Sequence, residues 1–226
     1  MGEVKDHSQT VFPNIEQAIC SIKYSVDNYL VFLKVSDEFD EYYNEEEKQK
    51  LIGFYKERIS LHEKSKYVDS NMLFPNKYKD SGFDLAVPWL NQDGLQNLGP
   101  YFYNSYAKKL CNLRVQVGVY KVDDCWGGLG PTKYPSPFYL YARSSIYKTP
   151  FILANNVGII DSGYRGNLCA ALYNTYSTPE VVGLVPGMGK RIVQICMPDL
   201  SGEFHVRLVK QLNDTSRGSG GFGSTG

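Results

Sequence analysis

The sequence lacks a charge excess of either sign, since 24 Lys and Arg residues balance 24 Asp and Glu residues. Domains that bind nucleic acid through its phosphates normally carry a basic surface, so this balance argues against bulk nucleic acid binding. There is no run of about 18 apolar residues, the minimum for a membrane-spanning helix. The first residues are polar, so we expect no signal peptide and a cytoplasmic location, in the host if the protein is viral.

Cysteines are few and scattered, and none is spaced as Cys-x-x-Cys. The five are Cys20, Cys111, Cys125, Cys169 and Cys196. An odd number without metal-ligand spacing indicates free thiols in a reducing compartment, not a disulfide framework or a structural zinc site. Apolar residues make up 42% and charged residues 21%, which is typical of a globular protein.

The first part of the chain carries a helical pattern. From Asn14, apolar residues recur at steps of three and four, which places them on one stripe of a helix. The β-branched residues near Val31 leave a strand open as an alternative at the far end. The stripe consists of Ile15, Ile19, Ile22, Val26, Tyr29 and Leu33.

A second helix is expected from about Glu45 to Lys64. Asn44 precedes it and Glu47 follows three residues later, which resembles a capping box. Two amphipathic helices predict a helical hairpin over residues 1–66. Its apolar stripes need a partner, so the hairpin is either a packing decoration or a device for oligomerisation or for binding a protein partner.

From Met72 onward the runs are short, aromatic and β-branched, and Gly or Pro recurs about every ten residues. Residues 113–120, 138–142 and 204–209 alternate in the way strands do. Many short strands predict a β-sandwich, a jelly roll or a barrel, and periodicity does not choose among them.

The last ten residues, 217–226, are rich in glycine. Successive backbone N–H groups in such a segment can bind an anion, and the guanidinium of Arg217 matches phosphate geometry. Phe222 offers a ring that can stack on a base. A Gly/Ser-rich disordered terminus has the same composition, so this segment alone does not distinguish a ligand-binding arm from a disordered terminus.

Five segments, in order, resemble the conserved motifs of the trimeric dUTPase family. They are Asp80–Leu85, Ala142–Ile146, Asn155–Gly166, Gly189–Ile195 and Arg217–Gly226. The resemblance covers about residues 70–226. It implies a distorted jelly roll that assembles as a homotrimer with active sites at the subunit interfaces.

We therefore expect a mainly β protein with an N-terminal α-helical hairpin extension. The expected division is a helical extension over 1–66, a dUTPase-like β domain over 67–210 and a flexible Gly-rich arm over 211–226. Within the β domain, residues 92–137 are predicted to form an enlarged connection, because the first two motifs lie further apart than the family usually has.

The resemblance implies hydrolysis of dUTP to dUMP and pyrophosphate by attack of water on the α-phosphate, with Mg²⁺ as cofactor. Asp161 would activate the water as a general base. Tyr164 would pack on the deoxyribose and exclude a 2′-hydroxyl. The side chain of Asn155 and the backbone of Gly158 would bind the uracil edge, while Arg165 is expected to brace the hairpin.

The other matched residues are expected to bind phosphates, base or metal. Asp84 would help to place Mg²⁺ through bound water, since Mg²⁺ keeps several waters. Arg143, Ser144, Ser145 and Gln194 are predicted to contact phosphates. Arg217, Ser224 and Thr225 would close over the γ-phosphate, and Phe222 with Gly223 over the uracil.

The fourth motif departs from the family, because Lys190 stands where an acidic residue usually precedes the arginine. Arg191 thereby loses its usual neighbouring carboxylate. The three histidines lie outside all five motifs. We therefore expect no catalytic histidine.

Two other functions remain open. A dCTP deaminase-like enzyme also tends to have Arg-Ser-Ser in its second motif, but is expected to lack the Phe-Gly-Ser-Thr tail. A binding or regulatory protein on the dUTPase scaffold would act through residues 1–66 or 92–137. Unchanged turnover with loss of a partner after removal of residues 1–66 would support that role, whereas loss of the trimer would support a structural one.

Overall fold

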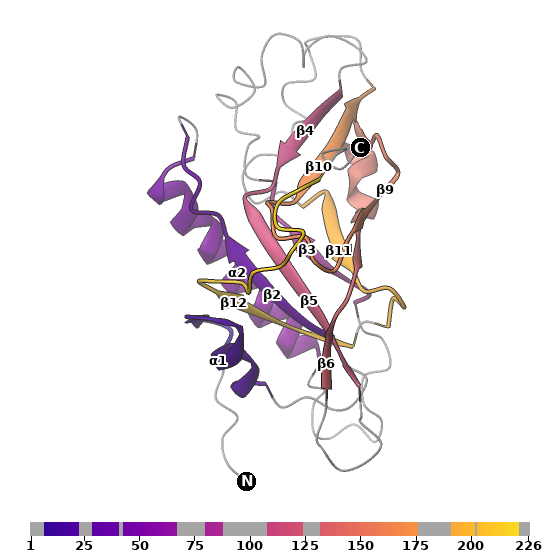
Figure 1. Cartoon of the computed structure of the whole chain (residues 1–226). Coiled ribbons are helices and arrows are strands. Elements are labelled where there is room, and N and C mark those ends of the chain that lie inside the picture. The colour runs from indigo at the N-terminus through magenta and orange to yellow at the C-terminus, as the bar shows by residue number, and fades with distance from the viewer. Residues whose placement is uncertain are drawn as a thin grey trace.

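The computed structural model describes residues 7–22, 29–40, 43–66, 80–87, 108–123, 132–175, 191–201 and 203–221. Strands dominate these ranges and form three sheets, with one long helix along their side (Figure 1). The expectation of a mainly β protein is confirmed, while the jelly-roll arrangement and the domain boundaries stay predictions. Within the described ranges no helix is both long and apolar enough to cross a membrane.

The five-stranded sheet brings together the two ends of the chain. β2 (Tyr29–Val35) lies between β12 (Phe204–Val209) and β5 (Val115–Asp123). It runs parallel to β12 and antiparallel to β5. β1 (Val11–Phe12) and β6 (Thr132–Pro135) complete its edges.

The other two sheets carry most of the motif residues. In the four-stranded sheet the order is β3 (Gly82–Leu85), β11 (Val193–Cys196), β7 (Phe138–Ala142) and β9 (Val157–Ile160). In the three-stranded sheet it is β4 (Lys108–Asn112), β10 (Cys169–Asn174) and β8 (Phe151–Leu153). A 3₁₀ helix, η2 (Ser144–Lys148), follows β7.

The two α-helices in the described ranges both begin at asparagine caps. The Asn14 side chain accepts a hydrogen bond from the Gln17 amide at 3.0 Å, at the start of α1 (Ile15–Cys20). Asn44 does the same for the Glu47 amide at 3.1 Å, at the start of α2 (Glu45–Lys66). These side chains satisfy amides that the first turn leaves unpaired. The second predicted helix is confirmed.

The predicted helical hairpin is wrong in its first half. Its first helix ends at Cys20, and the second half of the proposed stripe belongs to strand β2. Leu30, Val31, Phe32 and Leu33 are all fully buried, so both faces of this strand are covered. A continuous apolar run is typical of such a strand. Because the same run also places apolar residues at helical spacing, periodicity did not distinguish a helix from a strand here.

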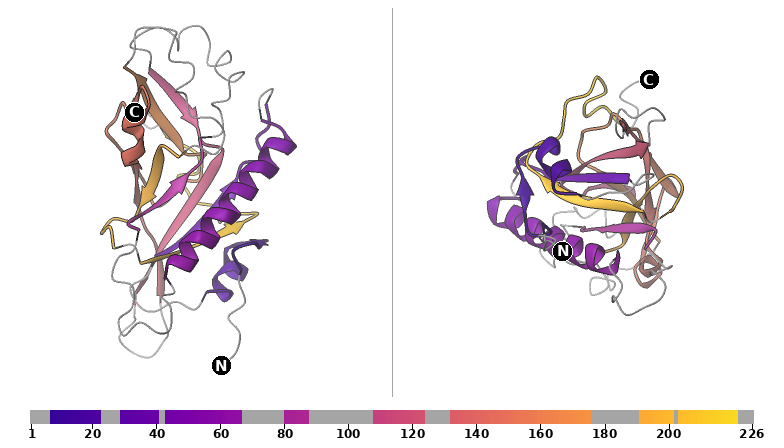
Figure 2. Two further views of the ribbon diagram at one scale, coloured as in Figure 1. Left: turned by 180° about the vertical axis from the view of Figure 1, so that it is seen from behind. Right: turned by 90° about the horizontal axis from the view of Figure 1, so that it is seen from below.

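The N-terminal segment shares its core with the rest of the protein. Val31 and Leu33 on one face of β2 join Leu51, Tyr55 and Ile59 of α2 in the main core. The other face of β2 packs on a second, smaller core that includes residues of α1. Figure 2 shows α2 along one side of the strands, where it contacts β2, β3 and β12.

The stretch 92–137, expected to be an enlarged connection, includes the strand predicted at 113–120. Its described residues contain three strands, β4, β5 and β6, and β5 covers most of that predicted range. β5 has nine residues and pairs along the whole length of β2. Its Val115, Val117 and Val119 are buried in the main core, so this stretch supplies framework as well as loops.

Candidate active site

A tight turn and a strand build one wall of the site. Asn156 takes a positive φ of 57°, which asparagine tolerates better than most residues. β9 then pairs with β7, with Gly158 opposite Leu140. A Cβ at position 158 would lie 3.1 Å from the Leu140 Cβ, so glycine permits this close approach of the two strands.

A pocket of about 250 Å³ lies between this hairpin and the described part of the C-terminal arm. It is large enough for a small molecule and not for a macromolecular surface. Five of the predicted site residues line it. The lining consists of Asn155, Gly158, Ile159, Ile160, Asp161, Tyr164, Leu168, Cys169, Arg217, Gly220 and Gly221.

The charged pair in this pocket is Asp161 with Arg217. The Asp161 Oδ2 lies 2.8 Å from the Arg217 Nη2, and the two side chains are 54% and 39% exposed. Asp161 follows β9 directly, and Arg217 arrives from the arm. The fold therefore brings the third and fifth motifs together within one chain.

Two glycines, Gly166 and Gly221, leave the space that the Tyr164 ring occupies. A Cβ at Gly166 would lie 2.5 Å from the Tyr164 hydroxyl oxygen, and one at Gly221 would lie 3.2 Å from the ring. The hydroxyl donates a hydrogen bond to the Asn167 carbonyl at 2.9 Å. Burial raises the pKa of Tyr164, so the phenol stays a donor at neutral pH.

Arg165 braces the hairpin against the arm, as predicted. Its guanidinium donates to the carbonyls of Asn213, Ser162 and Tyr164 at 3.0, 3.1 and 2.8 Å. Its backbone amide donates to the Gly218 carbonyl at 2.7 Å. The side chain is buried in this network, so it is not placed as a phosphate ligand.

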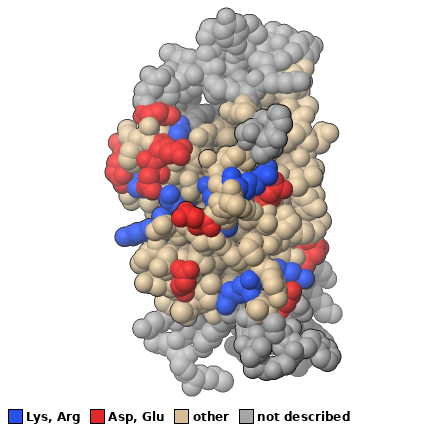
Figure 3. Space-filling model, in the orientation of Figure 1, with Lys and Arg blue, Asp and Glu red and all other residues tan. Residues whose placement is uncertain are grey.

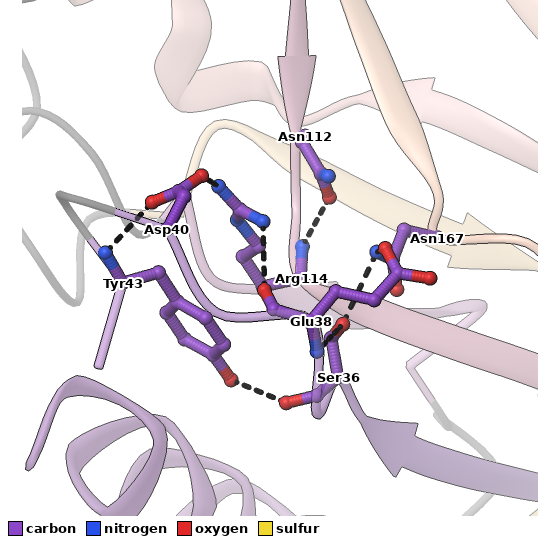
Figure 4. Close-up of polar contacts among 7 residues, drawn as sticks. All are labelled: Ser36, Glu38, Asp40, Tyr43, Asn112, Arg114 and Asn167. Carbon is purple, nitrogen blue, oxygen red and sulfur yellow. Dashed lines mark hydrogen bonds and ion pairs between the residues drawn. The ribbon is translucent and has the colours of Figure 1, made fainter. Parts of the chain in front are cut away.

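Behind Tyr164, a polar network ties the hairpin to the N-terminal segment (Figure 4). Asn167 donates to the Ser36 hydroxyl at 3.2 Å and to the Glu38 carboxylate at 2.9 Å. Arg114 donates to the Glu38 carbonyl at 3.1 Å and pairs with Asp40. The segment after β2 therefore supports the residue that accepts the Tyr164 hydrogen bond.

A second group of motif residues surrounds Asp84, whose side chain is 8% exposed. The Oδ1 of this carboxylate lies 2.5 Å from Arg143 Nε. Its Oδ2 lies 2.9 Å from Arg191 Nη1 and 3.2 Å from Arg58 Nη2. We call these four residues the arginine cluster. Arg191 thus finds a carboxylate in Asp84 despite the lysine before it.

The other predicted phosphate ligands lie near this cluster. Ser145 and Arg143 both donate to the Arg191 carbonyl, each at 3.0 Å. Gln194 stands opposite Asp84 in the pairing of β11 with β3. Ser144 is exposed at the start of η2. The first, second and fourth motifs therefore meet around one carboxylate.

The two groups lie at opposite ends of the β7–β9 pair. Ile160, just before Asp161, pairs with Phe138 at the start of β7, whereas Arg143 follows the last residue of β7. About six residues of strand separate the two levels, or roughly 20 Å at about 3.3 Å per residue. One chain therefore does not bring Asp161 and Arg143 to the same phosphate.

The arginine cluster does not fit a magnesium ion held by the protein. Both oxygens of Asp84 already contact guanidinium groups, and three cations surround the position. Among the described residues, no group of three His, Cys, Asp or Glu side chains is placed to hold a metal. The expectation that Asp84 helps to place Mg²⁺ gains no support from this arrangement.

Some predicted site residues lie outside the described ranges: Phe222, Gly223, Ser224, Thr225 and also Lys190.

Two residues at the sites were missed by sequence reasoning. Cys169 lines the pocket, and Arg58 joins the arginine cluster from α2. Neither residue carries a local signal, because a scattered cysteine and an arginine on a charged helix face are both common. The four described cysteines, Cys20, Cys111, Cys169 and Cys196, are free thiols, as expected.

The fold and the site define a mainly β protein with a small-molecule pocket that carries a carboxylate and a guanidinium. The dUTPase family model matches residues 136–226. A Desulfitobacterium hafniense deoxyuridine 5′-triphosphate nucleotidohydrolase is 47% identical over 90 residues, which is 39% of this chain and 56% of that protein. The same-named protein of Paramecium bursaria Chlorella virus 1 is 45% identical over 69 residues, 30% of this chain and 45% of the relative. Through this C-terminal segment the chain is similar to the dUTPase family.

The matched part is limited, since the chain spans about half the length of the curated relatives it matches. Among solved structures, a variant dUTPase of Staphylococcus bacteriophage 80alpha with dUpNHpp is 18% identical. The match covers 72% of this chain and 95% of that one, with a TM-score of 0.36. A likeness at that level carries no argument about function.

Proposed function

We propose that this protein is a dUTP diphosphatase, which hydrolyses dUTP to dUMP and pyrophosphate. The observation that carries the proposal is the pocket itself. It gathers Asn155, Gly158, Asp161, Tyr164 and Arg217 around one cavity. These are residues for which the family resemblance implies contacts with base, sugar, water and phosphate.

Asp161 has the exposure that a general base needs. With 54% of its side chain exposed, its carboxylate can reach a water molecule. The water oxygen bonds to the α-phosphorus, the bond from that phosphorus to the bridging oxygen breaks, and pyrophosphate leaves with the electron pair. The proton of the attacking water passes to Asp161.

Arg217 links phosphate binding to this base. A triphosphate carries more negative charge than one carboxylate, so it competes for the guanidinium that now pairs with Asp161. Movement of Arg217 to the phosphates would free the carboxylate to accept a proton. The docked backbone of Gly218 keeps this movement local to the side chain.

The fixed position of Tyr164 suits it to discriminate between deoxyribose and ribose. Its ring is held by Gly166, Gly221 and the hydrogen bond to Asn167, so it cannot move aside easily. A fixed ring against the deoxyribose would leave no room for a 2′-hydroxyl. We therefore propose that discrimination against UTP is steric.

The separation of Asp161 from Arg143 supports a site shared between copies of the chain, and we propose that the assembly is a homotrimer of jelly-roll subunits. A site that uses both residues on one triphosphate needs more than one copy of the chain. Closed cyclic assemblies repeat one heterologous contact around an axis and create equivalent shared sites. We propose that the arginine cluster of one copy serves the pocket of another.

Magnesium enters this proposal only with the substrate. Because the Asp84 carboxylate is surrounded by guanidinium groups, we infer that Mg²⁺ arrives on the triphosphate oxygens. Mg²⁺ bound to nucleotide phosphates commonly keeps several waters and few protein ligands. Inactivity in EDTA with recovery on addition of Mg²⁺ would support this part. The cytoplasmic location also stays a proposal, consistent with the free thiols.

The test is turnover of dUTP, UTP, dCTP and dTTP with Mg²⁺, followed by release of pyrophosphate and identity of the base. We expect pyrophosphate from dUTP alone. Asp161→Asn should lose about 10²–10⁴-fold in kcat. Asp123→Asn, at an exposed carboxylate of β5, is the matched control and should keep full activity.

Other outcomes point elsewhere. A uracil product from dCTP would assign the chain to the deaminase branch. Absence of turnover for every nucleotide in a folded, assembled protein would overturn the enzymatic proposal and favour a binding or regulatory role.

A further inference from the structure

Arg58 reaches the arginine cluster from a part of the chain outside the matched family segment. It lies on α2, whereas Asp84, Arg143 and Arg191 come from β3, the end of β7 and the start of β11. Arg58 Nη2 lies 3.2 Å from Asp84 Oδ2, the oxygen that Arg191 also contacts. Two guanidinium groups from different elements therefore share one carboxylate oxygen.

The cluster holds more positive charge than its own carboxylate balances. Three guanidinium groups pair with the single carboxylate of Asp84, which is nine-tenths buried. Asp80, an exposed carboxylate, adds an attraction to Arg58. Such an excess of cations in a partly desolvated place favours binding of an anion with several charges.

Arg58 itself is incompletely paired. Its Nε is buried and has no hydrogen-bond partner among the described residues. Burial lowers the pKa of its guanidinium, Asp84 opposes that change, and the neighbouring Arg191 and Arg143 add to the lowering. Because arginine keeps its charge in proteins, the three guanidinium groups of the cluster repel one another, and a bound anion would relieve that repulsion.

We propose that Arg58 is a third cation of the triphosphate-binding site and is supplied by α2. It holds Asp84 when Arg143 and Arg191 turn their donors toward the phosphates, so the buried carboxylate is not left without a counter-charge. This role rests on the proposed function for the identity of the anion. It makes α2 a part of the active site and not an appendage.

The competing explanation is that Arg58 only fastens α2 to β3. If Arg58 has only this structural role, its substitution should change the stability of the protein. If it belongs to the phosphate site, its substitution should change the affinity for polyphosphate without changing the affinity for a nucleoside monophosphate. dUMP lacks the β- and γ-phosphates and is therefore the matched ligand. Inorganic tripolyphosphate has no base or sugar and reports on the cluster alone.

The experiment is calorimetric titration of the full chain with tripolyphosphate and with dUMP, for wild type, Arg58→Gln, Arg58→Lys and Lys64→Gln. Without Arg58, the buried Asp84 would compete with the phosphates for Arg143 and Arg191, so tripolyphosphate binding should weaken about tenfold in Arg58→Gln. The affinity for dUMP should not change. Arg58→Lys keeps the charge and should recover part of the loss. Lys64→Gln removes a charge from an exposed position of the same helix and should match wild type.

Equal weakening for tripolyphosphate and dUMP, or no weakening for either, would overturn the proposal. If wild type binds tripolyphosphate but turns over no nucleotide, the proposed function fails while the role of Arg58 is still decided by these titrations. If Arg58→Gln does not fold, Arg58→Lys decides. Weaker tripolyphosphate binding at unchanged dUMP affinity supports the proposal, and wild-type values for both contradict it.

Discussion

Asp161 and Arg217 form an ion pair within the chain itself, with 2.8 Å between Oδ2 and Nη2. The pair depends on backbone contacts of the arm, in which the Gly218 carbonyl accepts from the Arg165 amide. The Thr215 hydroxyl also donates to the Gly163 carbonyl. The arm therefore delivers a cation to the carboxylate that follows β9.

Arg217→Ala should lower turnover without unfolding the protein. Both side chains of the pair are exposed by more than a third, so the ion pair contributes less than about 1 kcal/mol to stability. Loss of a charge-assisted phosphate contact should lower kcat/KM for dUTP by at least about tenfold. Steady-state kinetics and thermal melting check the two parts. Wild-type kcat/KM in this variant would remove Arg217 from the site.

Gly166→Ala should damage sugar discrimination. The new Cβ would stand 2.5 Å from the Tyr164 hydroxyl oxygen and 2.7 Å from Cζ, so the ring must move. We expect a higher KM for dUTP and a smaller ratio of kcat/KM between dUTP and UTP. Tyr164→Phe keeps the ring and loses only the hydroxyl, so it should retain more discrimination. An unchanged ratio in Gly166→Ala would contradict the steric role of Tyr164.

Two strands have the bounds that sequence reasoning predicted. β7 and β12 match the ranges 138–142 and 204–209, because a short run of alternating or β-branched residues marks each of them, whether one face is buried, as in β7, or both, as in β12. β2 was left open only as an alternative to the end of a helix, because its continuous apolar run fits both periods. The identity of a covering element is a tertiary property that local pattern does not contain.

The candidate site divides in a similar way. Asp161, Tyr164 and Arg217 were predicted from motif resemblance, and the fold brings them to one pocket. Arg58 was not predicted, because it stands on a helix face filled with Lys and Glu, where solvent is the usual neighbour. Its contact with Asp84 arises from the packing of α2 on β3, which only the fold reveals.

Cys169 should react slowly with iodoacetamide and should be protected by ligand. Burial raises the pKa of its thiol, so less thiolate is present at pH 8 than for an exposed cysteine. Its rate should therefore keep rising with pH above the range in which an ordinary thiol ionises. Because Cys169 lines the pocket, dUMP should slow its labelling and leave that of Cys20 unchanged. Mass spectrometry of labelled peptides measures both, and equal labelling with and without dUMP would contradict the pocket assignment.

Gly53→Ala should stabilise the protein. Gly53 lies in the interior of α2, and a Cβ there meets no atom within 4 Å. Alanine lowers the entropy of the unfolded chain and should raise the free energy of unfolding by about 0.5–1 kcal/mol. Urea unfolding monitored by circular dichroism measures the change. A loss of stability would mean that an unseen contact occupies this helix face.

Leu33→Ala should be strongly destabilising, and removal of residues 1–66 should prevent folding. Leu33 is fully buried in the main core, and its strand lies between β12 and β5. A buried Leu to Ala change costs about 2–5 kcal/mol, through lost burial and the cavity left behind. Lys34→Ala, next to it on a partly exposed position, should cost less than about 1 kcal/mol.

Removal of residues 1–66 removes β2 and α2. Without β2, both β12 and β5 would expose unpaired edges and the main core would lose its α2 side. A folded, active chain of residues 67–226 would show instead that the N-terminal segment is an independent appendage, and urea unfolding of Leu33→Ala beside Lys34→Ala tests the same point one residue at a time.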